Sequence, residues 1–150
     1  MSRGLGDVYK RQLWSLDRKD GMEKAYCCFN SNARDFARFG QLLLNNGQWD
    51  GQQLISPAYL AEATSPDTRL VYKDLGKPNH CYGFQYWILD YKGMKIPYMR
   101  GILGQYVFTL PEKNAVIVRL GHKRSDTYTA DQHYPDDINT WLDAAMDLLQ

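Results

Sequence analysis

The sequence YMRGILGQY (Tyr98–Tyr106) is the stretch of this chain that most strongly indicates its fold. Gly101 and Gly104 stand three residues apart, and glycine lets a backbone turn sharply or approach a neighbour closely. The residues that follow, Tyr106–Leu110, alternate in the manner of a buried β-strand. The stretch therefore predicts a turn that leads into a strand, although the same two glycines would also fit a bulge inside an internal strand.

Segments on both sides of this turn show the two-residue period of β-structure. Tyr82–Leu89 alternates, with mostly aromatic residues on one face, and Met94–Met99 is a second strand candidate that a proline interrupts. Pro111–Asn114 predicts a hairpin turn between Tyr106–Leu110 and Ala115–Leu120. Because connections this short join antiparallel neighbours, we expect an antiparallel meander.

Three segments show helical signals. The longest, Asn32–Gly47, has a capping asparagine, apolar residues at helical spacing and an Asn-Asn-Gly stop. Gly40 inside it indicates close packing against a neighbour. Ser56–Thr64 begins with serine and proline, and Pro135–Leu149 begins with a proline followed by two aspartates. Helices laid on one face of an antiparallel sheet place the chain in the α+β class. Between them, residues 66–80 are expected to form a long loop.

Length and composition limit the possible functions. The 150 residues, 44% hydrophobic and 13% aromatic, suit one domain with a buried core. A net charge of +1 without a basic run does not indicate a nucleic-acid partner. No apolar stretch approaches the roughly 20 residues that cross a bilayer. Residues 1–12 resemble a translated sequencing adaptor, so we expect a non-native scar there and a partial domain at residues 13–150.

The three cysteines form no metal-binding or redox motif. Cys27 and Cys28 are adjacent, a spacing at which cysteines rarely pair with each other, and Cys81 stands apart. Unpaired cysteine is among the most often buried residues. We therefore expect buried thiols rather than a disulfide framework. The cysteine pattern does not distinguish an oxidising from a reducing compartment.

The chain carries no nucleophile motif of its own. None of its six serines begins Ser-x-x-Lys, no Gly-x-Ser-x-Gly occurs, and none of its 11 tyrosines begins Tyr-x-Asn. A serine hydroxyl without an activating base at fixed spacing is a weak nucleophile. The histidines and aspartates between residues 122 and 137 match no metal-ligand spacing, so we expect neither a metal site nor a cofactor.

Several segments resemble the β-lactamase-related serine hydrolases, which include class C β-lactamases, D-alanyl-D-alanine carboxypeptidases, esterases and 6-aminohexanoate-dimer hydrolases. The matching segments, in chain order, are Asn32–Gly51, Ile55–Pro57, Tyr82–Trp87, Arg100–Gln105, Pro111–Asn114 and Val116–Leu120. Together they cover nearly all of residues 25–150. The Arg-Gly-x-Leu-Gly-Gln sequence and the Cys-Cys pair look most like the amide- and ester-hydrolase branch near the 6-aminohexanoate-dimer hydrolases. The resemblance implies the C-terminal portion of the serine β-lactamase-like fold.

The resemblance also implies an acyl-enzyme mechanism, in which a serine of Ser-x-x-Lys attacks and a tyrosine of Tyr-x-Asn moves protons. Both motifs are absent from this chain. A third family motif, on the strand that edges the cleft, aligns with Met99-Arg100-Gly101. The resemblance assigns the oxyanion donor to the backbone N–H of Ile102. It places five residues against the substrate, which are Met99, Arg100, Gly101, Gly104 and Gln105.

Met99 departs from the family pattern. The family has Lys or His at this position, and a thioether cannot bind a substrate carboxylate. The neighbouring Arg100 could bind one. This departure argues against a true β-lactamase, whose substrates carry that carboxylate.

The resemblance therefore implies a fragment of a serine hydrolase that cleaves amide or ester bonds. The partners it implies are a small-molecule substrate and the missing N-terminal half of the domain. Its relatives are often periplasmic or exported, and the compartment of this chain stays open. A non-catalytic binding or interaction module with the same fold is the alternative, and an α+β domain of unrelated function is a third hypothesis.

Overall fold

The computed structural model of the chain describes residues 12–72, 76–131 and 133–149. Residues 1–11 of the expected scar lie outside the described residues, so that expectation stays a prediction. Gln12 lies within them. In the described part of the chain, no helix has the length and apolar character that a membrane crossing requires.

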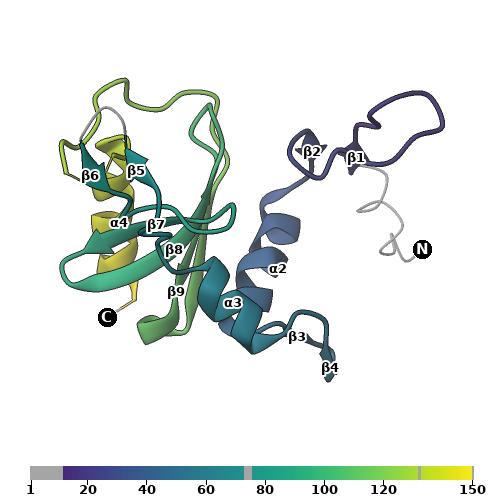
Figure 1. Cartoon of the computed structure of the whole chain (residues 1–150), viewed down its shortest axis with the longest axis horizontal. Coiled ribbons are helices and arrows are strands. Elements are labelled where there is room, and N and C mark those ends of the chain that lie inside the picture. Colours follow the sequence, from purple (N-terminus) through teal and green to yellow (C-terminus); the bar gives the residue numbers. More distant parts are fainter. Residues whose placement is uncertain (1–11, 73–75, 132, 150) are drawn as a thin grey trace.

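A four-stranded antiparallel sheet forms the centre of the fold (Figure 1). Its strands follow the order β10-β9-β8-β7, so each strand lies beside its neighbour in sequence. The strands are β7 (Trp87–Tyr91), β8 (Met94–Arg100), β9 (Tyr106–Leu110) and β10 (Ala115–Arg119). The predicted antiparallel meander is confirmed, and with it the α+β class.

Pro97 lies inside β8 and does not interrupt it. It pairs with Ile88 of β7, whereas the pairing of β8 with β9 begins one residue later, at Tyr98 opposite Phe108. Proline has no N–H to donate to a ladder. The sheet accommodates it because the ladder with β9 starts only after this position.

The strand expected from Tyr82 begins only at Trp87. The Gly83 N–H donates to the Tyr86 carbonyl at 2.8 Å, and Gln85 has a left-handed φ of 65°, so these residues form a tight turn. The aromatic rings of this turn pack against other rings: those of Tyr82 and Trp87 lie 4.7 Å apart, and those of Phe84 and Tyr59 lie 6.2 Å apart.

Helix α4 (Asp137–Leu148) covers one face of the sheet. Ile138 and Leu142 of the predicted apolar stripe are fully buried there, whereas Trp141 remains exposed. The buried cluster on this face consists of Leu89, Tyr91, Ile96, Tyr98, Tyr106, Phe108, Leu110, Tyr134, Ile138 and Leu142. It forms the main hydrophobic core of the described chain.

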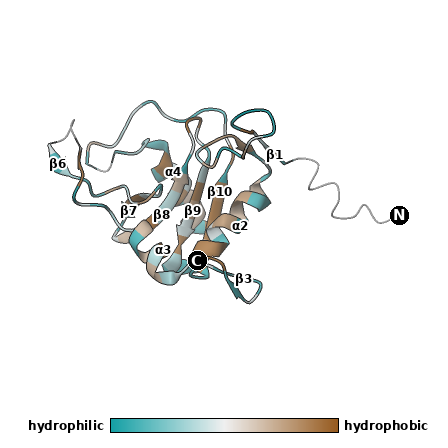
Figure 2. Cartoon of the chain, turned by 45° about the vertical axis from the view of Figure 1, so that its right-hand side comes forward, coloured by the Kyte–Doolittle hydropathy of each residue, from teal (hydrophilic) through white to brown (hydrophobic). Residues whose placement is uncertain are grey.

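Helix α2 (Ala33–Leu44) covers the opposite face, so the expectation of helices on one face is wrong (Figure 2). A Cβ on Gly40 would lie 2.5 Å from Cγ1 of Val116 and 3.2 Å from Cγ1 of Val107. Val107 and Phe108 are consecutive in β9 and therefore point to opposite faces of the sheet. Strand β9 is buried on both sides because a helix covers each side.

Both ends of α2 follow the sequence signals. The Asn32 side chain accepts hydrogen bonds from two backbone N–H groups of the first turn, at 2.9 and 3.1 Å. At the other end Asn46 takes the left-handed conformation, with φ 50°, and the Gly47 N–H donates to the Leu42 carbonyl at 2.8 Å. This is a Schellman motif, in which Asn46 occupies the position expected for Gly47.

Short elements connect these layers. They are the hairpin of β3 (Gln48–Trp49) and β4 (Gln52–Gln53), helix α3 (Pro57–Ala63), the hairpin of β5 (Val71–Tyr72) and β6 (Lys77–Pro78), and the 3-10 turn η1 (Pro111–Lys113). The predicted helix after Ser56 is confirmed. The Ser56 side chain accepts a hydrogen bond from the Tyr59 N–H at 3.2 Å. Residues 66–80 contain the β5–β6 hairpin and are thus not a pure loop.

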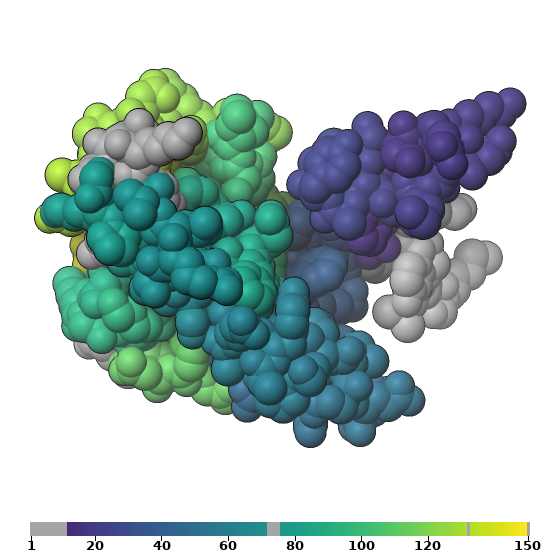
Figure 3. All heavy atoms as spheres, viewed as in Figure 1, coloured from purple at the N-terminus to yellow at the C-terminus, as the bar shows by residue number. Residues whose placement is uncertain are grey.

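The N-terminal segment lies against α2 and away from the sheet. Strand β1 (Leu13–Trp14) pairs with β2 (Phe29–Asn30), and the Phe29 ring lies 5.4 Å from that of Phe36 and 6.0 Å from that of Phe39. In Figure 3 this segment, coloured purple, projects from the body of the molecule. The aromatic cluster and the hydrogen bond from Gln12 to Asp35 attach it to α2.

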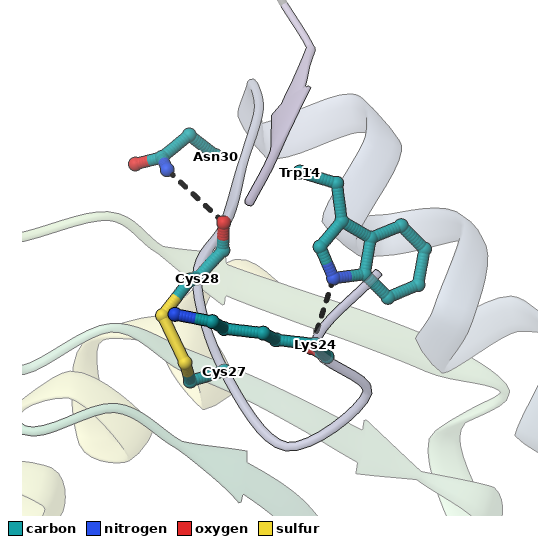
Figure 4. The surroundings of a disulfide bond; sticks show 5 residues. All are labelled: Trp14, Lys24, Cys27, Cys28 and Asn30. Carbon is teal, nitrogen blue, oxygen red and sulfur yellow. Dashed lines mark hydrogen bonds between the residues drawn. A yellow bond between two sulfur atoms is a disulfide. The ribbon is translucent and has the colours of Figure 1, made fainter. Parts of the chain in front are cut away.

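Cys27 and Cys28 form a disulfide with each other, so the expectation of two buried thiols is wrong (Figure 4). Cys28 has a left-handed φ of 72°, which the sequence pattern does not indicate. The Asn30 amide donates to the Cys28 carbonyl at 3.3 Å, and the Trp14 indole N–H donates to the Lys24 carbonyl at 2.9 Å. Cys81 is a buried cysteine, as expected.

We expect Gly40→Ala to destabilise the protein. Alanine favours a helix by about 1 kcal/mol over glycine, but here its methyl would overlap Val116, and overpacking costs about 1–3 kcal/mol. Urea unfolding should show a net loss of about 1 kcal/mol. Gln41→Ala on the exposed side of α2 is the matched control and should change stability by less than about 0.5 kcal/mol. A stabilised Gly40→Ala variant would contradict the close approach of α2 to the sheet.

Asp35 gives the N-terminus of α2 a pH-dependent stability. Its side chain is only 4% exposed, and it accepts hydrogen bonds from Gln12 at 2.7 Å, from Ser31 and from Asn32 at 2.9 Å. These bonds, the one from Gln12 first, lower the pKa of Asp35, and Arg38 contributes through its charge. The carboxylate is therefore stabilised in the folded state.

A carboxyl whose pKa is lower in the folded than in the unfolded chain stabilises the fold. The stabilisation is complete above the unfolded-state pKa, about 3.9, and disappears as the pH falls through the folded-state pKa. We therefore expect the wild-type chain to lose more stability than Asp35→Asn between about pH 5 and pH 2. Urea unfolding across this pH range measures the difference. Asp50→Asn in the exposed β3–β4 turn is the control. If the free energy of unfolding changed equally with pH in the wild type and in Asp35→Asn, these bonds would not favour the ionised form of Asp35.

Candidate functional site

The two glycines of the opening stretch lie in the hairpin turn between β8 and β9. Arg100 opposite Tyr106 is the last pair of the ladder, and the Gly101 N–H donates to the Gln105 carbonyl at 2.8 Å. The turn residues 101–105 lie at the end of the sheet opposite the Pro111–Lys113 turn (Figure 1). The structure thus has the predicted turn into a strand, and not a bulge within an internal strand.

Each glycine is required by a close approach. Gly104 has φ 83°, and a Cβ there would lie 2.8 Å from the Lys123 carbonyl oxygen and would overlap the Arg119 guanidinium. A Cβ on Gly101 would lie 3.0 Å from the Cβ of Gln105 and would overlap its amide oxygen. The obstacle at Gly101 is therefore a side chain, whereas that at Gly104 includes backbone.

Side chains from the turn itself, from the end of β10 and from the segment after β10 hold the turn. The Gln105 amide accepts from the Leu103 N–H at 3.1 Å and donates to the Gly121 carbonyl at 3.0 Å. The Arg124 Nε–H donates to the Ile102 carbonyl at 2.8 Å, and Arg119 donates to the Gly104 carbonyl. The peptide group between Ile102 and Leu103 is thus fixed at both its oxygen and its nitrogen.

The Ile102 N–H itself is available. Ile102 is 81% exposed, and its N–H makes no hydrogen bond to another described residue. Most buried backbone donors are paired, but a solvent-facing N–H on a rigid turn can donate to a ligand. The residue for which sequence reasoning predicted a donor role thus has a donor that no protein atom uses.

The two other motif residues point to opposite faces of the sheet. Met99 pairs with Val107 and shares its face, the one covered by α2, whereas Arg100 lies on the face of α4. The structure therefore does not bring these two side chains together. β7 begins at Trp87, opposite Tyr98, so at Met99 and Arg100 strand β8 pairs only with β9.

The Arg100 guanidinium is held by aromatic and neutral polar groups. Its carbon lies 3.4 Å from the centroid of the Trp87 ring and 5.8 Å from that of Tyr128. It donates to the His133 carbonyl at 3.0 Å and more weakly to the Tyr98 hydroxyl at 3.4 Å. Stacking of this kind orients the guanidinium without neutralising its charge.

Two tyrosines near the turn stay protonated. Burial, followed by the nearby Asp137 carboxylate, raises the pKa of Tyr106 to about 12, and the Tyr106 hydroxyl donates to that carboxylate at 3.3 Å. Burial also raises the pKa of Tyr98, although Arg100 opposes this shift. A phenol with a raised pKa is a poor general base at neutral pH. Neither tyrosine replaces the absent Tyr-x-Asn tyrosine.

The described residues include no group of three or more His, Cys, Asp or Glu side chains placed to hold a metal ion. The sequence analysis did not single out Arg119, Arg124 or Tyr128. No motif marks them, since Arg119 reaches the turn from the end of β10, and Arg124 and Tyr128 come from the irregular segment that follows.

Comparison with known proteins relates the chain to one of the solved structures. No family profile and no curated protein matches the chain. Among solved structures, it is similar to a "Putative 6-aminohexanoate-dimer hydrolase" from Bacillus anthracis, with a TM-score of 0.61 and 25% sequence identity. The match covers 91% of this chain and 32% of that protein, so the chain spans about a third of its neighbour's length. The comparison supports the resemblance to the β-lactamase-related serine hydrolases.

A series of glycine substitutions would measure the constraint on the turn. Gly104→Ala combines a positive φ with a backbone contact, and we expect a loss of about 1–3 kcal/mol in urea unfolding. Gly93→Ala in the β7–β8 turn is the matched control, because Gly93 also has a positive φ, 88°, but nothing within 4 Å of an added Cβ. Gly104→Ala must cost more than Gly93→Ala. Equal losses would mean that the approach of residues 119–124 to the turn is not tight.

Proposed function

We propose that this chain is the C-terminal part of a serine hydrolase that cleaves amide or ester bonds through an acyl-enzyme. In this proposal the turn 101–105 forms one wall of the cleft, and the Ile102 N–H is the oxyanion donor. The single observation that carries the proposal is a backbone N–H with no acceptor among the described residues, on an exposed turn residue whose next peptide group is held at both ends. Such preorganised donors stabilise a developing oxyanion.

Three arginines strengthen the electrostatic argument. Arg100, Arg119 and Arg124 all reach the turn or the strand beside it, and the hydrogen bonds they make are to carbonyl or hydroxyl oxygens. None of them forms a salt bridge with a carboxylate of the described chain. Their positive charge would favour negative charge on the substrate carbonyl oxygen.

The proposal gives the remaining motif residues the following roles. Met99 contacts the substrate from the face of α2 as an uncharged group, and Arg100 supplies a cation from the other face. Gly101 and Gly104 let the backbone approach the substrate, and Gln105 holds the turn in shape through its two hydrogen bonds.

The nucleophile and base belong, in this proposal, to an N-terminal half of the domain that packs against the present chain. The structure exposes large apolar side chains that such a half could cover, among them Met22, Tyr26, Leu54 and Ile102. The coverage of only 32% of the Bacillus anthracis neighbour is consistent with a larger protein. Its substrate would be a small amide or ester.

A non-catalytic binding module is the alternative, favoured by the absence of Ser-x-x-Lys and Tyr-x-Asn from the sequence. Genomic DNA upstream of the Leu13 codon separates the two. An in-frame Ser-x-x-Lys would support the hydrolase, whereas an authentic start codon near residue 13 with no such motif upstream would support the binding module.

In the polypeptide that includes the upstream segment, Ile102→Pro tests the oxyanion donor. Proline removes the N–H while Gly101 tolerates the restriction that proline places on its predecessor. We expect kcat for a p-nitrophenyl ester to fall about 100- to 1,000-fold, as for loss of one oxyanion donor. Ile102→Ala keeps the N–H and removes only an exposed side chain, so its kcat should stay within about twofold of the wild type. Equal activity of the two variants would exclude Ile102 as the donor.

A further inference from the structure

The disulfide between Cys27 and Cys28 lies directly before strand β2, in the N-terminal segment 12–30. Side chains of adjacent residues in an extended chain point to opposite sides, so a bond between two of them requires the backbone to leave the extended conformation. Cys28 leaves it with a φ of 72°, a left-handed value that residues with a Cβ seldom adopt. The disulfide and the left-handed backbone of Cys28 therefore belong together.

This disulfide does not act by closing a loop of the chain. Disulfides stabilise a fold chiefly by restricting the unfolded chain, and the gain grows with the length of the loop that they close. Cys27 and Cys28 are adjacent in the sequence, so this gain is minimal here. What the bond constrains is the direction in which the backbone leaves Cys28.

That direction determines where the next residue, Phe29, is placed. The centroid of the Phe29 ring lies 5.2 Å from that of Trp14 and 5.4 Å from that of Phe36 in α2. The Cys28 carbonyl accepts a hydrogen bond from the Ser15 N–H at 3.4 Å, beside the pairing of β1 with β2. The conformation of Cys28 therefore positions both the aromatic contact with α2 and the bond to the opposite strand.

The disulfide is accessible, and the segment that contains it is attached to the molecule at one side. Cys28 is exposed and Cys27 is partly exposed, so an external thiol can reach the Cys28 sulfur. The neighbouring Tyr26 is 79% exposed, and the segment projects from the body of the molecule (Figure 3). A change of backbone conformation at Cys28 can therefore move the segment without disturbing the sheet.

We propose that Cys27 and Cys28 form a redox switch, which holds the N-terminal segment on α2 when oxidised and releases it when a dithiol reduces the bond. One thiolate of the dithiol attacks the Cys28 sulfur, the S–S bond breaks, and Cys27 leaves as a thiolate that takes up a proton. The second thiol of the reductant then displaces Cys28 and closes the reductant's own disulfide, so the protein gains two electrons and two protons.

Release follows from the preference of Cys28 for a negative φ once the bond is absent. Its carbonyl then turns away from the Ser15 N–H, and Phe29 leaves its position against Phe36. The switch lies in a different part of the chain from the turn 101–105 and does not depend on the proposed hydrolase activity.

Alkylation of the full 150-residue chain with iodoacetamide under denaturing conditions tests the bond itself. In a chain purified in air-saturated buffer we expect one labelled cysteine, Cys81. After treatment with dithiothreitol all three cysteines of the sequence should be labelled. Three labelled cysteines before reduction would overturn the switch, because the bond would not have formed.

NMR spectra of the oxidised and the reduced chain test the release. Nuclear Overhauser contacts between the Phe29 and Phe36 rings should be present in the oxidised chain and lost after reduction. Amide hydrogen exchange at Ser15 should become at least about tenfold faster, whereas amides of β8 and β9 should stay within about twofold. Ring contacts that persist after full reduction would reject the switch. Faster exchange throughout the sheet would also reject it, since reduction would then unfold the whole chain.

Variants separate the bond from the backbone conformation. Cys28→Ser removes the bond and keeps a Cβ, so its N-terminal segment should be released with or without dithiothreitol. Cys28→Gly also removes the bond, but glycine accepts a positive φ, so the ring contacts should persist under both conditions. Cys81→Ala is the matched control and should respond to dithiothreitol as the wild type does.

Two results from these variants would count against the inference. A Cys28→Ser chain that keeps the ring contacts between Phe29 and Phe36 would overturn the switch. Equal release in Cys28→Gly and Cys28→Ser would contradict the role given to the φ of Cys28.

Discussion

The burial of β9 on both faces is the constraint on which the rest of the structure depends. Tyr106, Phe108 and Leu110 belong to the core beneath α4, and Val107 meets Gly40 of α2 on the other side. Consecutive residues of a strand point to opposite faces, so this one strand carries both layers of helix. Full burial also fixes its register, because a slip by one residue would exchange the two faces. Because the register of β9 is fixed, the position of the turn at its end is fixed as well.

The turn shows how a rigid element can present one polar atom. A short hairpin on its own would be mobile, but here the Ile102 carbonyl accepts a bond from Arg124 in the segment after β10. The Gly104 carbonyl accepts one from Arg119 at the end of β10. The arginines are oriented in turn by Tyr106, Trp141 and Tyr128. This network satisfies the neighbouring polar groups and leaves the Ile102 N–H without an acceptor among the described residues. This preorganisation is what an oxyanion site requires.

The same network explains the charge at the turn. Arginines placed for structural reasons would normally be paired with carboxylates or point to solvent, yet here they bond to neutral oxygens and stack on rings. The cost of leaving such cations unneutralised is modest at a partly exposed surface, where water screens them. Three arginines thus lie at or beside the turn in a chain whose net charge is only +1. In the proposed function their charge favours the developing oxyanion.

The sequence alone determined the elements whose signals are local. Asn32 and Ser56 as helix caps, Gly40 as a contact point, the antiparallel hairpins and the turn at Gly101 and Gly104 all follow from neighbouring residues. Ring packing made Tyr82–Tyr86 look like a strand, because aromatic residues at alternate positions fit both structures.

Tertiary structure alone decided the placement of helices on both faces, the Cys27–Cys28 disulfide and the separation of Met99 from Arg100. It also brought Arg119, Arg124 and Tyr128 to the turn. The placement of the helices and the approach of Arg119, Arg124 and Tyr128 depend on contacts between segments distant in the chain, which no spacing rule encodes. The separation of Met99 from Arg100 depends on β8 continuing to Arg100. The disulfide depends on the local backbone conformation at Cys28, whose φ is positive.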